Sequence, residues 1–159
     1  LTNQPYVKHK LHMEQLLQES GHPYLICRVS NVAGPGGNPK TIFHYLAKQV
    51  QDEHEFPLWK HAYRNLLDVD DVFALADHFI RAGMRNAVVN IAHPVSYSMP
   101  QIMEAYQHHF NKHGRYFEIE AGHHFPIDTA EVESAAAAAG VDFGHDYLYR
   151  LLRKYYPVS

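Results

Sequence analysis

The stretch that decides the fold runs from Tyr6 to Gly37 and reads YVKHKLHMEQLLQESGHPYLICRVSNVAGPGG. The run from Tyr6 to Ser20 predicts a helix, and the apolar run Tyr24–Val29 that follows predicts a strand. We expect this strand to be buried on both faces, because a nearly continuous apolar run is typical of a parallel sheet covered by helices. A helix followed by such a strand indicates the end of a βαβ unit in an α/β protein.

Tyr6 and Lys10 lie four residues apart in the predicted helix. Residues with this spacing share one face of a helix, so a phenol and an ammonium can reach the same small volume. A neighbouring ammonium stabilises a phenolate and makes the phenol a better acid or base. Tyr6 is therefore a candidate for proton transfer. The alternative is that Tyr6 is a core ring and Lys10 a solvated charge, since such pairs are common on helices.

Composition narrows the class of protein. The chain has 159 residues, 46% of them hydrophobic, which is enough for the core of one ordinary domain. A net charge of −3 argues against nucleic acid as a partner. No apolar run approaches the roughly 20 residues of a spanning helix, and residues 1–4 do not resemble a signal peptide, so we expect no membrane partner. The single cysteine, Cys27, is consistent with a reducing compartment, and we expect a cytoplasmic protein.

Alternating periodicities predict the elements that follow. In chain order they are a helix over 41–51, a strand from Arg64 into a helix capped by Asp70 and ended by Gly83, a strand over 87–91, a helix capped by Ser98 and ended by Gly114, a strand over 116–120, an alanine-rich helix opened by a capping box of Asp128 and Glu131 and ended by Gly140, and a last helix from Asp146. The glycine- and proline-rich stretch 34–39 follows a strand end, where open α/β sheets bind ligands.

Two motifs together resemble a known family. Tyr6-x-x-x-Lys10, a buried strand and the segment RVSNVAGPG at 28–36 resemble the extended short-chain dehydrogenase/reductase family, the NAD-dependent epimerases and dehydratases of nucleotide sugars. In a second motif, Arg64, Val69 and Asp71 match an arginine at the head of a strand that ends in valine-x-aspartate. The resemblance covers essentially the whole chain, but only the second half of the family's pattern.

The resemblance implies an α/β fold in which the chain forms the C-terminal portion of a Rossmann-like parallel sheet and a small α+β substrate-binding part. It divides this single fragment into a sheet portion, residues 1–36 and 71–97, and a substrate-binding portion, residues 37–70 and 98–159. Tyr6 would be the catalytic acid/base, with Lys10 supporting it and holding the nicotinamide ribose.

The resemblance also implies binding residues. Val29 would join Tyr6 and Lys10 in binding NAD or NADP, and Asn31 and Arg64 would bind the nucleotide-sugar substrate. From the residues alone, Arg64 could instead form an ion pair with Asp68 or Asp71, and Asn31 could be a turn former before the glycines. Which nucleotide sugar is bound stays open, as does the choice among epimerase, dehydratase and reductase.

Three features depart from the family. The sequence contains neither G-x-x-G-x-x-G nor G-x-G-x-x-G, the turn that binds the NAD pyrophosphate. Ala33 stands where the family often has an aromatic residue, and no arginine lies near His124, where many members have one. We therefore expect a fragment that cannot hold NAD alone and that self-associates or pairs with a missing N-terminal half; the resemblance implies a homodimeric parent.

Two other functions are weighed against the enzyme. One is a non-catalytic fragment that binds nucleotide sugars or takes part in assembly. The other is a metal-binding protein, suggested by the fourteen histidines and above all by His108, His109, His113, His123 and His124. The cysteine pairs and the H-E-x-x-H motif of strong zinc sites are missing, so we predict no metal site.

Overall fold

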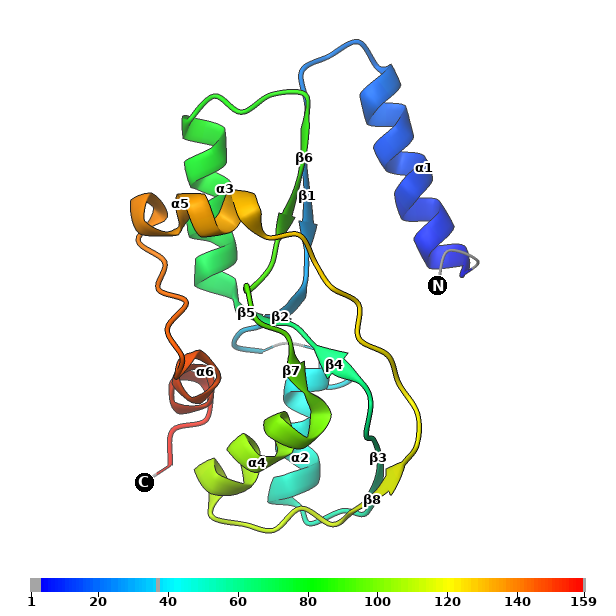
Figure 1. Cartoon of the computed structure of the whole chain (residues 1–159), viewed down its shortest axis with the longest axis vertical. Helices are drawn as coiled ribbons and strands as arrows, with labels where there is room; N and C mark the ends of the chain where they lie inside the picture. The colour runs from blue at the N-terminus through cyan, green and yellow to red at the C-terminus, as the bar shows by residue number, and fades with distance from the viewer. Residues whose placement is uncertain (1–3, 37, 159) are drawn as a thin grey trace.

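The computed structural model describes residues 4–36 and 38–158, an α/β arrangement of short parallel strands and helices (Figure 1). None of the helices in these two ranges is long and apolar enough to cross a membrane. In chain order the elements are α1 (Pro5–Glu19), β1 (Leu25–Val29), β2 (Asn31–Ala33), α2 (Ile42–Gln51), β3 (Phe56–Trp59), β4 (Tyr63–Arg64), β5 (Leu66–Asp68), α3 (Val69–Arg81), β6 (Ala87–Ile91), β7 (Tyr97–Ser98), α4 (Met99–Phe110), β8 (Tyr116–Ile119), α5 (Ala130–Ala139) and α6 (Tyr147–Tyr155).

The strands pair two by two. β1 lies parallel to β6, β2 parallel to β5, and β3 parallel to β8, while β4 and β7 are antiparallel. Three of these pairs, β2–β5, β3–β8 and β4–β7, involve strands of only two to four residues. The predicted strands at 24–29 and 87–91 are confirmed as β1 and β6, the longest pair.

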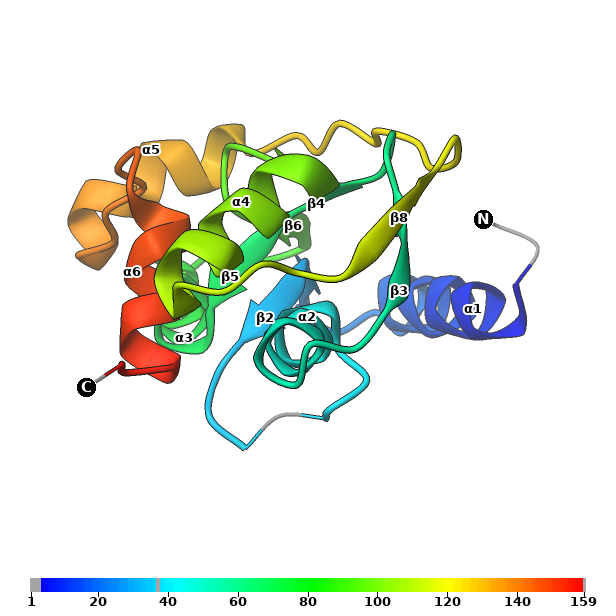
Figure 2. The same cartoon turned by 90° about the horizontal axis from the view of Figure 1, so that it is seen from below.

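The core lies mainly in the part of the molecule that holds α2, α4 and α6 (Figure 2). Apolar residues recur at helical spacing in α2, where Phe43 and Leu46 are buried. Phe43 meets the fully buried Tyr106 of α4 edge-on, with ring centroids 6.0 Å apart. The Tyr106 hydroxyl donates to the Phe43 carbonyl at 2.8 Å, which satisfies its one polar group inside the core.

Two helix ends differ from the predicted residues. α3 is capped by Asp68, not Asp70, because Asp68 keeps an extended backbone while its carboxylate accepts from the Asp70 amide at 2.9 Å. α4 ends at Asn111, not Gly114, since Asn111 adopts the left-handed conformation (φ 50°) that closes the helix. Asparagine tolerates this conformation better than most residues do.

Among the other predicted caps, Ser98 and Gly140 are confirmed and the capping box of Asp128 is not. Ser98 opens α4 through a capping box with Gln101, as predicted: the Ser98 amide donates to Gln101 Oε1 at 2.8 Å. The capping box of Asp128 and Glu131 is wrong, because α5 begins one residue later than that box requires. Asp128 Oδ1 instead accepts from the Ala130 amide. Gly140 ends α5 in the left-handed conformation, as predicted.

β1 is not buried on both faces, which corrects the prediction. Ile26 is buried, but Arg28 and Val29 are exposed. Within residues 4–36 and 38–158, β1 has a strand neighbour only on its β6 edge. α1, which stands to one side of β1 in Figure 1, contains no buried residue. The second face and the second edge of β1 therefore have no covering layer in the described part of the chain.

Candidate active site

Tyr6 and Lys10 lie together in the first turns of α1. Pro5 occupies the start of the helix, where its missing N–H costs nothing, so the chain becomes helical immediately before Tyr6. Lys10 Nζ lies 5.6 Å from the centroid of the Tyr6 ring. Tyr6 is 69% exposed, so it is not a core ring, and the first alternative for this residue is wrong. The phenol and the ammonium face the same open space.

Arg28 ties α1 to β1. Its guanidinium donates twice to the Glu14 carboxylate, at 3.0 Å from Nε and 2.6 Å from Nη2. These hydrogen bonds from Arg28 are the main reason that the pKa of Glu14 is lowered. α1 runs in the opposite direction to β1, and its N-terminal end lies level with the end of β1 but stands apart from the strand (Figures 1 and 2). The end of β1 is the end at which α/β sheets bind ligands.

Val29 and Asn31 follow at that end. Val29 is the last residue of β1 and is exposed. Asn31 begins β2, so it is a strand residue and not the turn former of the alternative interpretation. Its amide and its Nδ2 both donate to the Asn65 carbonyl, at 3.2 and 3.0 Å. The Asn31 Oδ1 accepts no hydrogen bond from the described residues, which leaves an acceptor for a ligand.

The glycine at the start of the 34–39 stretch serves packing. A Cβ on Gly34 would lie 3.1 Å from a methyl group of Val69, tighter than ordinary contact. Gly34 thus lets the chain pass close to the first residue of α3. Gly36 adopts the left-handed conformation (φ 62°), which favours glycine.

Arg64 lies in β4 beside a small aromatic cavity. Its Nη1 donates to the Tyr63 carbonyl at 2.8 Å, and its side chain lines a cavity of about 150 Å³ with Tyr45, Phe56 and Trp59. Among the described residues it has no carboxylate partner. The ion pair with Asp68 or Asp71 is therefore wrong, and most of the guanidinium N–H groups of Arg64 stay available.

Asp68 and Asp71 bind α6 instead. Lys154 Nζ lies 2.8 Å from Asp68, and the Tyr155 hydroxyl donates to Asp68 at 2.7 Å. Burial raises the pKa of Asp68, but these two hydrogen bonds outweigh it, so the net shift is downward. The Tyr147 hydroxyl donates to Asp71, whose pKa is raised mainly by burial. These carboxylates therefore hold the start of α3 against α6.

Sequence reasoning missed Asn65, which connects the predicted substrate residues. It directly follows Arg64, and its carbonyl accepts both hydrogen bonds from Asn31. Asn65 is 5% exposed. A polar residue before the apolar pair Leu66 and Leu67 was the available signal, because a buried amide must find hydrogen-bond partners.

The structure bonds Asn31 to Asn65, the neighbour of Arg64, and leaves Tyr6 and Lys10 on a separate element. Asn31 and Arg64 meet through Asn65, where β2 lies beside β5. Tyr6 and Lys10 lie on α1, which stands beside β1, with Val29 at the strand end between the two groups in the sequence. The two groups are the candidate site residues, and in the described part of the chain no hydrogen bond or shared cavity connects them.

Three of the histidines weighed as metal ligands make other contacts. His109 Nε2 lies 2.6 Å from the Tyr156 carbonyl, and His108 meets the Tyr149 ring edge-on. His124 stacks on Tyr63 with ring centroids 4.4 Å apart. The described residues contain no cluster of three or more histidine, cysteine, aspartate or glutamate side chains that could hold a metal ion.

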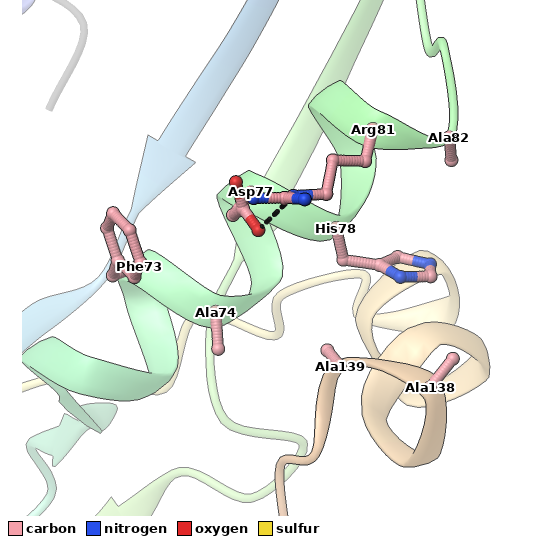
Figure 3. Close-up of a pocket in the computed structure, with 8 residues that line it drawn as sticks. All are labelled: Phe73, Ala74, Asp77, His78, Arg81, Ala82, Ala138 and Ala139. Carbon is pink, nitrogen blue, oxygen red and sulfur yellow. Dashed lines mark hydrogen bonds and ion pairs between the residues drawn. The ribbon is translucent and has the colours of Figure 1, made fainter.

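A second concavity lies on the opposite side of β1 and β6 from α1. This groove of about 520 Å³ runs between α3 and α5 and is lined by Phe73, Arg81 and Ala139, among others (Figure 3). Arg81 Nε pairs with Asp77 Oδ2 across one helical turn at 2.6 Å. His78 also lines this groove, and none of the residues proposed for catalysis or binding does.

One family model matches more than half of the chain. The profile described as "NAD dependent epimerase/dehydratase family" matches residues 1–92. No curated protein matches the chain.

Solved structures share the fold at low identity. UDP-glucuronic acid 4-epimerase from Bacillus cereus, solved with UDP-glucuronic acid and NAD, is 19% identical with a TM-score of 0.69, over 92% of this chain and 53% of that one. RMD from Pseudomonas aeruginosa, solved with NADPH, is 18% identical with a TM-score of 0.72, over 93% and 54%. dTDP-glucose 4,6-dehydratase from Bacillus anthracis, solved with NAD, is 17% identical with a TM-score of 0.66, over 83% and 45%. The chain spans about half the length of these structures.

Proposed function

Because the chain belongs to the NAD dependent epimerase/dehydratase family, we propose that it supplies the proton-transfer pair and the nucleotide-sugar site of an NAD(P)-dependent epimerase, dehydratase or reductase. The observation that carries the proposal is the exposed pair of Tyr6 and Lys10, in which the ammonium lies 5.6 Å from the centroid of the ring. The nucleotide complexes of similar structures support the substrate class. Cys27, a free thiol, suits a cytoplasmic enzyme.

Each residue has a role in this proposal. The Tyr6 hydroxyl exchanges a proton with a hydroxyl of the sugar, and the Lys10 ammonium stabilises the phenolate. Arg64 binds phosphate oxygens through its remaining N–H groups, and the aromatic cavity beside it accepts the base. Asn31 offers its free Oδ1 to the sugar or ribose hydroxyls. Residues 37–70 and 98–159 would form the substrate-binding portion, and residues 1–36 and 71–97 the sheet portion.

The chain fits one end of the cofactor. Tyr6, Lys10 and Val29 are exposed, and they would hold the nicotinamide riboside of NAD or NADP. The bound cofactor supplies a hydride acceptor and donor. The sequence contains no glycine-rich turn for the pyrophosphate, so no residue of this chain is assigned to that half. A second piece that carries such a turn, with the open edge of β1 as its contact, would complete the site.

A second candidate function rests on the same open edge of β1. A chain that buries no residue of α1 and, among the described residues, pairs β1 on one edge only could bind a nucleotide sugar without catalysis, as a binding or assembly fragment. In that case Arg64 and Asn31 would keep their roles, and Tyr6 would have none. Self-association through the same surface is compatible with either function.

Substitution of Tyr6 separates the two functions. In a protein that combines this chain with a glycine-rich half, we expect Tyr6→Phe to reduce turnover about 10²–10⁴-fold, because the phenol can no longer transfer a proton, while NAD affinity stays nearly unchanged. Tyr149→Phe, on α6, is the matched control. Near-normal turnover of the Tyr6→Phe protein would refute the catalytic role.

A further inference from the structure

The side-chain amide of Asn65 forms two hydrogen bonds with the backbone of His93. Asn65 Nδ2 donates to the His93 carbonyl at 2.7 Å, and the His93 amide donates to Asn65 Oδ1 at 2.9 Å. Two antiparallel strands exchange the same pair of bonds between opposite residues. The amide of Asn65 thus acts as a strand neighbour for the residue that follows the end of β6 by two positions.

The side-chain amide of Asn65 also contacts other residues of the segment 93–96, which we call the 93–96 loop. Asn65 Nδ2 also lies 3.2 Å from Ser96 Oγ and 3.4 Å from the Val95 carbonyl. Asn65 and His93 are both almost completely buried, so water does not replace these bonds. The 93–96 loop is therefore fixed to β4 and β5 by one side chain.

The main chain of Asn65 holds a third segment. Its carbonyl accepts from the amide and from Nδ2 of Asn31, the first residue of β2. Asn65 consequently joins β2, the β4–β5 segment and the 93–96 loop. Arg64, one residue earlier, pairs with Tyr97 in the β4–β7 ladder, one residue beyond that loop. A displacement of Asn65 would shift Arg64 and Asn31 together.

We propose that Asn65 is a positioning residue for nucleotide binding, which holds Arg64 and Asn31 in one fixed arrangement. The inference rests on the proposed function, because it assigns Asn65 the task of placing the two substrate residues. Asn65 does not touch the nucleotide; it acts through Arg64 and Asn31. An amide is required there, since it must donate to carbonyls and accept from an N–H on the same side chain.

Neither similar side chain can replace it. Aspartate at position 65 would turn an acceptor oxygen toward the carbonyls of His93 and Val95 and bury a charge without a cation. Alanine would leave the His93 amide and carbonyl buried without their partner. In both cases the 93–96 loop would separate from β4, and Arg64 would lose its fixed position.

The test is a double-mutant cycle on nucleotide affinity, measured by calorimetry on the chain with UDP, dTDP and GDP as probes. We expect Asn65→Ala to bind the preferred probe roughly tenfold more weakly than wild type, and to cause a clearly smaller loss when Arg64 is already alanine, because only the displacement of Asn31 then still weakens binding. Arg85→Ala is the control for Arg64, because each of these arginines donates to the preceding carbonyl at 2.8 Å. Asn90→Ala is the control for Asn65, since it removes an amide bond, to the Asp128 carbonyl, away from Arg64.

The outcomes separate the two proposals. If wild type binds none of the probes, the proposed function fails, and this inference fails with it. If wild type binds but Asn65→Ala binds equally well, or weakens binding by the same factor with and without Arg64, only the role of Asn65 is overturned. Asn65→Ser, which keeps a group that can both donate and accept, covers the case in which the alanine variant does not fold: we expect affinity between that of wild type and that of Arg64→Ala, and wild-type affinity would overturn the inference.

Discussion

α2 and α1 are both helices with regularly spaced apolar residues, but one is packed and the other is not. α2 buries Phe43, Leu46, Ala47 and Val50 against its neighbours. α1 is longer, yet Leu11, Met13, Leu16 and Leu17 are all more than two fifths exposed. In the described part of the chain, the side of the molecule that carries Tyr6 and Lys10 therefore lacks a layer which the α2 side has.

Matched leucine substitutions give the largest expected difference between the two helices. Leu46→Ala should lower the free energy of unfolding by about 2–5 kcal/mol, because it leaves a cavity in a packed core. Leu16→Ala should change it by less than about 0.5 kcal/mol, since that side chain is 47% exposed. Urea unfolding of both variants measures the difference. Equal losses would show that α1 is packed in solution.

Asp68, which bonds to Lys154 and Tyr155 of α6, lies in a packed region whose stability should depend on pH. The pKa of Asp68 is lowered in the folded protein, so its contribution to stability is present above the unfolded pKa, about 3.9, and is lost as the pH falls through the folded value. Asp68→Asn removes the ion pair with Lys154 but keeps an acceptor for the Asp70 amide. It should cost roughly 1–3 kcal/mol at pH 7. Urea unfolding at pH 7 and below pH 4 should show this cost shrinking; a cost that stays constant would contradict the assigned pKa shift.

The pair of Arg28 and Glu14 should contribute the least. Half of the Arg28 side chain is exposed, so we expect Glu14→Gln to change stability by at most about 1 kcal/mol. Because the pair ties α1 to β1, amide hydrogen exchange in α1 should nevertheless become faster. Asp77→Asn, which breaks the exposed pair with Arg81, is the control. Unchanged exchange in α1 would mean that other contacts hold the helix.

Local patterns predicted the helices well. The periodicity of Thr41–Gln51 and the Ser98 capping box lie within single segments, and both are confirmed. Asp68 and Asp70 could each cap α3 on sequence grounds, and only the extended backbone of Asp68 decides between them. The error at β1 is of another kind. Its apolar residues indicate a strand correctly, but burial on both faces also needs a second layer, which the described residues do not supply, and the strand contains the charged Arg28.

The pairing of short strands was beyond local patterns. β2 meets β5 and β3 meets β8 across long intervening segments, and runs of three or four residues carry no register signal. Of the candidate site, the sequence pointed to Tyr6, Lys10, Asn31 and Arg64 through motifs. Asn65 is not one of the motif residues. Its role depends on hydrogen bonds to residues 31 and 93–96, which are distant in the sequence.

The central claim is that the face formed by α1 and the open edge of β1 is the unfinished side of a cofactor site. Sedimentation of the chain, combined with titration by NAD(H), tests it most directly. We expect association at micromolar concentration, weakened by Leu16→Glu more than by Phe117→Glu, together with no tight NAD(H) binding. A stable monomer that binds NAD(H) tightly would contradict the claim, because the chain would then form a complete cofactor site by itself.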